Sequence, residues 1–219
     1  MANHVASSLN FIRMNAKAKE KLAMLLKWNE MQSGSGSLEN FHEIMEHAPE
    51  SPDYSWYHDN VGPKWCHFED YDLDVIRCES AWGWPDQGYH WLIGELRKED
   101  PYLLAYCNYE DEAPNFYGVA GWGPAGFEDY YTDIDEGIEW WKKGKEFEFI
   151  RPYLEENEDG EKPEEFYENI WEAIGTHQDT MWDMDCRSDV ELYDDDGNEV
   201  EYNEDGTPKK DVKPTWQDQ

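Results

Sequence analysis

Positive charge is scarce in this sequence. Among its 219 residues, 18 Lys and Arg stand against 51 Asp and Glu, for a net charge of −33 at pH 7. Nonspecific affinity for nucleic acid depends on Lys and Arg that neutralise phosphates, and anionic membranes attract the same side chains. The composition therefore argues against direct binding to nucleic acid or to an anionic membrane surface.

Long apolar runs are also lacking. No stretch approaches the roughly 20 apolar residues that a membrane-spanning helix needs, and the opening MANHVASSLNF lacks the basic and then apolar layout of a signal peptide. We therefore expect a soluble cytoplasmic protein. Disordered acidic chains are poor in aromatic residues, whereas this chain has 12 Trp, 14 Tyr and 8 Phe, so most of it should fold.

Cysteine is sparse and never closely paired. Cys66, Cys78, Cys107 and Cys186 stand far apart, without the C-x-x-C spacing typical of zinc and iron–sulfur sites. Cys66 has His67 beside it, but adjacent strand residues point to opposite faces. The sequence predicts reduced thiols and neither a metal nor a cofactor.

Periodicity predicts an α+β domain. Residues 4–11 alternate as a strand does, and Asn15 is a plausible cap for a helix that continues through Leu26. A short helix over 38–45 and an irregular aromatic loop through Trp56 and Tyr57 should follow. The remaining elements are strands at 64–68 and 73–79, a helix that begins at 84–85 and ends at 100–101, and strands at 102–108 and 116–122. This β-α-β-β-α-β order with one added strand is the split βαβ sandwich of ferredoxin-like domains.

Two short motifs carry a resemblance to a known family. Gly62-Pro63-Lys64-Trp65 and Ser80-Ala81-Trp82-Gly83-Trp84-Pro85, with Phe116-Tyr117-Gly118 further on, are similar to the turns and strand ends of the YubB/Api92-type ferredoxin-like domain. Pro63 and Trp84 depart from its pattern. The resemblance covers roughly residues 1–125. It implies an origin on a bacteriophage or conjugative plasmid, and we therefore expect the protein in the cytoplasm of the host cell. The resemblance implies no established activity. The term "ferredoxin-like" refers to the fold alone and not to an iron–sulfur cluster.

The motif tryptophans allow two interpretations. Trp65, Trp82 and Trp84 would pack turns and strand ends against the sheet. Alternatively, Trp82, Trp84 and Trp91 would form an exposed recognition patch, since Trp is favoured at interface hot spots. Their burial distinguishes the two.

Negative charge is concentrated late in the chain. Residues 1–28 carry +4, which leaves −37 for residues 29–219, and residues 146–205 alone contain 23 acids against three cations. Within that segment, residues 163–175 predict a helix with Pro in its first turn and Gly175 after the last apolar residue. Its apolar stripe, which should dock on a core, comprises Phe166, Tyr167, Ile170, Trp171 and Ile174.

Acidic side chains should cover the exposed sides of this helix. Glu164, Glu168 and Glu172 form an i, i+4, i+8 row that repeats about every 6 Å, against about 3.4 Å between phosphates of a DNA strand. Such like-charge pairs cost stability, so we interpret them as serving a partner. The predicted partner-binding face comprises Glu155, Glu156, Glu158, Asp159, Glu161, Glu164, Glu165, Glu168, Glu172, Asp194, Asp195 and Asp196.

A hairpin should complete this acidic extension. Residues 190–193 and 199–202 flank the turn residues Asp196, Gly197 and Asn198. An EF-hand with Gly197 at its sixth position would need acids where Leu192 and Asn203 stand, which excludes it. The predicted organisation is a ferredoxin-like domain at 1–125, an acidic helix and hairpin extension at 126–202, and a loose tail at 203–219.

Motifs of the common enzyme classes are missing. The chain has no P-loop, nucleophile elbow or H-E-x-x-H. Asp-x-Asp pairs at 72/74, 133/135 and 183/185 could hold a divalent metal, but chance produces such pairs in a chain this acidic. We expect no catalytic residue.

Charge and resemblance together predict a non-enzymatic phage or plasmid protein. It would bind a basic, nucleic-acid-handling host protein, such as a defence or restriction factor, and block its groove as an acidic DNA mimic. The alternatives are a metal-dependent enzyme that uses the carboxylate pairs, a structural or assembly protein whose charge is solubilising, and a sugar-binding protein with Trp and Tyr platforms.

Overall fold

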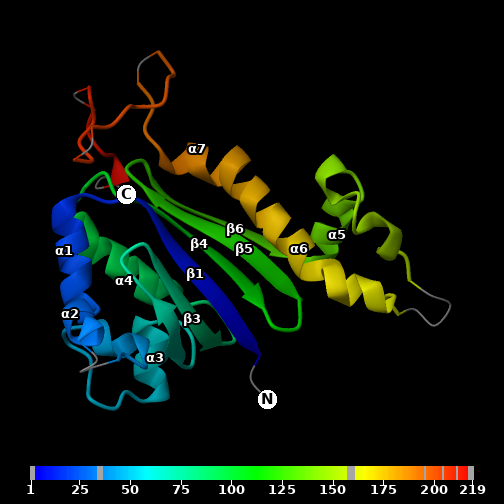
Figure 1. Cartoon of the computed structure of the whole chain (residues 1–219), viewed down its shortest axis with the longest axis horizontal. Helices are drawn as coiled ribbons and strands as arrows, with labels where there is room; N and C mark the ends of the chain where they lie inside the picture. The colour runs from blue at the N-terminus through cyan, green and yellow to red at the C-terminus, as the bar shows by residue number, and fades with distance from the viewer. Residues whose placement is uncertain are drawn as a thin grey trace.

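A six-stranded antiparallel sheet organises the protein. The computed structural model describes residues 3–33, 37–156, 161–194, 196–203, 205–210 and 212–216. The strands lie in the order β2-β3-β1-β4-β5-β6 (Figure 1). They are β1 (His4–Arg13), β2 (Cys66–Tyr71), β3 (Val75–Ala81), β4 (Leu104–Asp111), β5 (Phe116–Gly123) and β6 (Gly126–Asp133).

The N-terminal strand β1 lies inside the sheet. Its Ser7 pairs with Cys78 of β3 on one side and with Tyr109 of β4 on the other. Because side chains alternate along a strand, Val5 and Leu9 enter the core on one face, whereas Ala6 points to the opposite face and is exposed.

The first face of the sheet is covered by α1 (Ala16–Leu25) and α4 (Asp86–Arg97). The Asn15 side chain accepts a hydrogen bond from the Ala18 backbone N–H at 2.9 Å and so starts α1 where the sequence predicts. Leu9, Leu22 and Leu92 belong to the same buried core. The shorter helices of this half are α2 (Trp28–Gln32), η1 (Phe41–Ile44) and α3 (Tyr54–Asn60).

The second face is covered over β5 and β6. The long helix α6 (Glu164–Met181) continues into a π-helix, η4 (Trp182–Cys186), and into α7 (Arg187–Val190). Two glycines of β5 allow this close approach: a Cβ at Gly121 would lie 2.6 Å from Cys186 Sγ, and one at Gly123 would lie 2.2 Å from the Val190 carbonyl oxygen. Beside them stand α5 (Ile134–Trp141), η2 (Lys145–Phe147) and η3 (Arg151–Tyr153).

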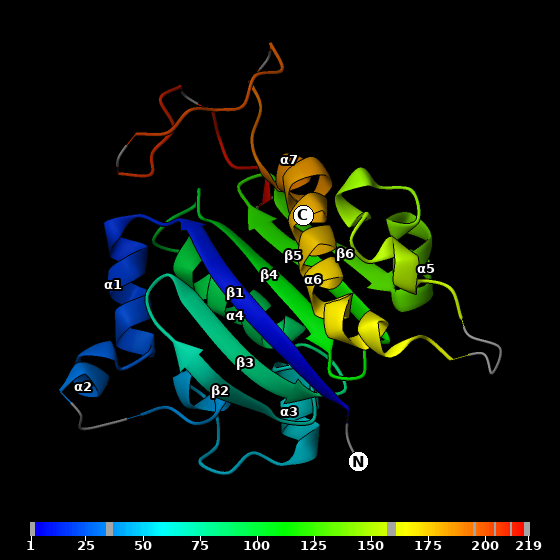
Figure 2. The ribbon, with the colours of Figure 1, turned by 45° about the vertical axis from the view of Figure 1, so that its right-hand side comes forward.

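The same face remains open over β2, β3 and β1. Figure 2 shows α6 crossing in front of β5, while no described helix passes in front of these three strands. Polar side chains therefore point to solvent there, among them Ser8, Glu69, Arg77 and Glu79.

Several expectations need correction. The segment expected to be an irregular aromatic loop is the helix α3, whose first turn is capped by the Asp53 side chain at 2.9 Å from the Trp56 N–H. The boundary expected at residue 125 falls in the turn between β5 and β6, and β6 continues the sheet. The predicted hairpin is present but shorter than expected: Tyr193 bridges Glu199, and the Val200 N–H donates to the Leu192 carbonyl at 2.9 Å, whereas Val190 still belongs to α7. The α+β class holds, but six strands exceed the four of a split βαβ unit.

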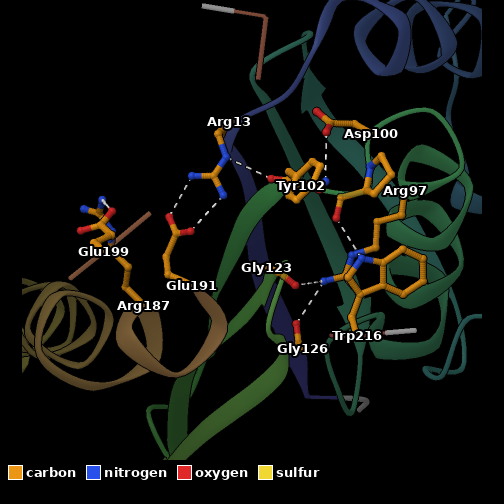
Figure 3. A network of polar contacts seen from close by, with 11 residues as sticks. Arg13, Arg97, Asp100, Tyr102, Gly123, Gly126, Arg187, Glu191, Glu199 and Trp216 are labelled. Carbon is orange, nitrogen blue, oxygen red and sulfur yellow. Dashed lines mark hydrogen bonds and ion pairs between the residues drawn. The ribbon is translucent and has the colours of Figure 1, made fainter. Parts of the chain in front are cut away.

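The C-terminal segment, for which we predicted a loose tail, contacts the body of the protein (Figure 3). The Trp216 indole N–H donates to the Pro101 carbonyl at 2.9 Å, and its ring lies 4.8 Å from the Arg97 guanidinium. Arg97 is buried and donates to the carbonyls of Gly123 and Gly126. The tail thus covers the end of α4. Among the described residues no helix has the length and apolar character required to cross a membrane.

Candidate functional site

Helix α6 separates its apolar and acidic sides. Pro163 precedes the helix, and Glu164 and Glu165 in its first turn complement the positive end of the helix dipole. Its buried side, which faces the second core, comprises Phe166, Ile170, Ala173, Ile174, His177, Gln178 and Met181.

Two members of the predicted apolar stripe are not buried. Tyr167 is 57% exposed and Trp171 is 43% exposed. Each follows a buried residue, Phe166 or Ile170, by one position, a rotation of about 100° around the helix. The prediction that they dock on the core was wrong. Trp171 instead faces the open part of the sheet.

The acids of α6 form the best-defined part of the predicted face. Glu164, Glu165, Glu168 and Glu172 are exposed, and none forms an ion pair with a described residue. The exposed residues Glu155, Glu156 and Glu161 lie on the segments that lead into this helix, whereas Glu158 and Asp159 fall outside the described residues.

The C-terminal acids have a different role. Asp194 accepts backbone hydrogen bonds from Asp196 and Asn198 and pairs with Lys210, contacts that lower its pKa to about 2. Asp196 is exposed in the same turn, and Asp195 lies outside the described residues. Because the helices α6 and α7 separate this turn from Glu164, the structure does not bring the two acidic groups together (Figure 1).

Other acids near this turn are also used internally. Glu191 is 2% exposed and receives two hydrogen bonds from Arg13, at 2.9 and 3.0 Å (Figure 3). Glu199 pairs with Arg187 at 3.2 Å. Arg13, one of the cations of the positively charged N-terminal segment, is therefore paired within the fold.

A polar groove runs between α6 and the open strands. We call it the open-sheet groove; it joins two adjacent clefts of about 280 and 330 Å³ that share Ala6, Glu69 and Glu110. It is lined by His4, Ala6, Ser7, Ser8, Glu69, Arg77, Glu79, Asn108, Glu110, Glu112, Trp171 and Gln178. Its acids come from β2, β3, β4 and the turn after β4, so none belongs to the predicted face. Sequence reasoning missed them because they are dispersed over 44 residues, from 69 to 112.

The floor of this groove holds partly buried polar groups. Burial raises the pKa of Glu110, although a hydrogen bond of 3.2 Å from the Gln178 side-chain amide opposes this effect. The Asn108 side-chain oxygen is buried and has no hydrogen-bond partner in the described structure. Arg77 contacts Asp70 at 3.1 Å, and His4 pairs with Glu79. A ligand that donates hydrogen bonds and carries positive charge would complement these groups.

The motif tryptophans divide between the two interpretations. Trp84 is half-buried and stacks on Tyr109 with ring centroids 5.0 Å apart, while Trp65 is half-buried beside His4 at 5.1 Å. Trp91 also packs on the core. Trp82 is 55% exposed. The packing interpretation therefore describes Trp65 and Trp84, and Trp82 is the exposed member.

Two of the candidate metal ligands, Asp72 and Asp133, serve local structure. The Asp72 carboxylate accepts from the Asp74 and Val75 backbone N–H groups in a turn, and Asp133 caps α5. Within the described part of the chain, no three His, Cys, Asp or Glu side chains are grouped so as to hold a metal ion. All four cysteines are buried, and burial raises the pKa of the Cys66 and Cys107 thiols.

Comparisons with known proteins give no family. No protein-family model, no curated protein and no solved structure matches this chain. The likeness to the YubB/Api92-type domain therefore depends on the motif residues alone.

Proposed function

We propose that this chain is a non-enzymatic binding protein whose acidic face docks on a basic, nucleic-acid-handling protein. The observation that carries this proposal is the exposed Trp171, which stands between the α6 carboxylates, which form no ion pair with a described residue, and the carboxylates of the open-sheet groove. The fold we propose for its first four strands is the ferredoxin-like one, with β5 and β6 added at the β4 edge.

Charge complementarity supports such a partner. Glu164, Glu168 and Glu172 repel one another at helical spacing, which costs a few tenths of a kcal/mol for each pair. A cationic partner surface would remove this repulsion. At the groove, an arginine could stack on Trp171 and donate to Glu110 or Asn108, since its guanidinium combines a planar face with several donors.

Nucleic-acid mimicry is restricted to one end of the molecule under this proposal. The α6 row alone repeats about every 6 Å and is sparser than the phosphates of a DNA strand. The groove carboxylates add charge beside the row, whereas Asp194 is occupied by its own turn and by Lys210. The motif resemblance favours a phage or plasmid accessory protein, and thus a host defence or restriction factor as the partner.

The test compares two charge-reversed proteins of equal net charge. In one, Glu164, Glu168 and Glu172 become Lys; in the matched control, Glu20, Glu46 and Glu50 become Lys, on α1 and the loop after η1. Tagged proteins are used to capture partners from host cytosol at low and high salt, with and without excess duplex DNA. Captured proteins are identified by mass spectrometry.

We expect one basic protein that DNA displaces and that the α6 variant no longer retains. Trp171→Ala should weaken the same complex by roughly 2 kcal/mol, as expected for a hot-spot Trp. Equal retention by the α6 variant and by its control would remove this face from consideration.

A further inference from the structure

A further cleft, separate from the open-sheet groove, lies where the two sequence motifs meet. It has a volume of about 370 Å³ and is formed by the start of α4, by α3 and by the turns on either side of the β2-β3 pair. Gly62, Pro63 and Lys64 of the first motif line it together with Trp82 and Trp84 of the second. A cleft of this size falls within the range of small-molecule sites.

Trp82 is held in this cleft at a conformational cost. Its φ of +71° lies in the left-handed region, which is unfavourable for a bulky side chain. The turn fixes this backbone, because the Trp82 N–H donates to the Asn3 carbonyl at 2.9 Å. Glycine would adopt the same conformation without strain. Since 55% of Trp82 is exposed, packing alone does not account for a Trp here.

Tyr54 extends the aromatic surface of Trp82, and Lys64 places a cation over the Trp82 ring. Tyr54, itself 51% exposed, meets Trp82 edge to face with centroids 6.4 Å apart. The Lys64 ammonium lies 5.0 Å from the centre of the Trp82 ring. That ammonium occupies the position that a ligand cation would take over the ring and repels such a ligand.

The remaining polar groups disfavour an anion. Asp86 lies at the wall, close enough to Gly62 that a Cβ there would be 2.0 Å from its carboxylate oxygen, and the whole chain carries −33. Lys64 supplies donors, Asp86 supplies acceptors, and the His58 ring can supply either. A neutral ligand with both apolar and hydroxyl-bearing faces matches this combination.

We propose that the Trp82 cleft binds a neutral saccharide, with a sugar ring placed against Trp82 and Tyr54 and its hydroxyls hydrogen-bonded to Lys64 and Asp86. This site is separate from the acidic face, and neither proposal depends on the other.

The test compares the parent chain with Trp82→Gly, a variant that removes the indole and relieves the backbone strain at this position. Neutral gluco-, manno- and N-acetylglucosamine oligosaccharides are titrated into the full chain at millimolar concentration, and the indole N–H signals are followed by NMR. We expect at least one to shift the Trp82 signal, assigned by its loss in Trp82→Gly. That variant should bind about tenfold more weakly or worse, a loss of about 1.4 kcal/mol, and should be no less stable than the parent.

Asp86→Asn and Trp171→Ala separate this site from the rest of the surface. Asp86→Asn, which preserves shape, should weaken saccharide binding, whereas Trp171→Ala should leave it unchanged. No shift with any saccharide would overturn the proposal. So would equal binding by Trp82→Gly, or a Trp82 shift produced only by a nucleoside monophosphate or a proline-rich peptide, which serve as the comparison ligands.

Discussion

The buried His177 is a source of acid sensitivity at the scale of a single residue. It is 4% exposed, its Nδ1 lies 2.6 Å from the Tyr117 hydroxyl oxygen, and its ring stacks on Trp140 at 4.5 Å. Burial lowers its pKa to about 4, although the charge of Glu146 acts in the opposite direction. The folded protein therefore keeps this ring neutral, and protonation opposes folding.

The stability that His177 contributes should be complete above pH 6.5 and should fall as the pH drops toward 4. In this window the unfolded chain binds a proton on His177 that the folded chain does not bind. At 1.36 kcal/mol per pKa unit, the loss approaches roughly 3 kcal/mol. Urea unfolding at stepped pH should show a flatter profile for His177→Gln. The exposed His47→Gln variant should retain the parent profile, and identical profiles for all three proteins would contradict the assignment.

At the scale of elements, the C-terminal segment should stabilise the end of α4. Trp216→Ala removes the indole hydrogen bond to Pro101 and the contact with the buried Arg97. We expect a loss of about 1–2 kcal/mol in the free energy of unfolding. Trp171→Ala, which truncates an exposed ring, should change it by no more than about 0.5 kcal/mol. Denaturant unfolding measures the free energy of unfolding of both variants. An equally small loss in the two would mean that the Trp216 contacts do not stabilise the end of α4.

Local signals in the sequence predicted most, but not all, of these elements. Asn15 marks the start of α1, and strict alternation marks β1, so both were found. The strand β6 was missed because it is an edge strand with acids such as Glu128 and Asp129 on both faces. The burial of Trp171 was misjudged because five apolar residues on a helix span a wider arc than the core covers. The apolar residues of the helix were identified correctly, but Trp171 was assigned to the buried side and is exposed.

The site was less predictable because it depends on contacts distant in sequence. Residues 163–175 reveal an acidic helix by themselves, and that part of the site was anticipated. Nothing local indicates that Glu69, Glu79 and Glu110 share a groove with Trp171, since the sheet order brings them together. The cleft at Trp82 was likewise hidden, because left-handed backbone at a Trp has no sequence signature.

For the whole molecule, salt should increase the stability of the isolated protein. A net charge of −33 produces self-repulsion in the folded state, which salt screens with a Debye length of about 8 Å at 0.15 M. The melting temperature should therefore rise with NaCl. Reversal of Glu164, Glu168 and Glu172 adds six charge units and gives −27, so this variant should show a smaller rise. A melting temperature that falls or stays constant over the series would contradict this expectation.

The position of β1 inside the sheet has a consequence for synthesis on the ribosome. Its two partners are β3, which ends at Ala81, and β4, which ends at Asp111. β1 is therefore synthesised before either partner: β3 is complete only about 70 residues later, and the second edge of β1 stays unpaired until β4 is complete, about 100 residues after β1. Such non-local pairing slows folding and leaves the nascent chain exposed to aggregation. The serines of β1, Ser7 and Ser8, would help to keep the unpaired strand soluble.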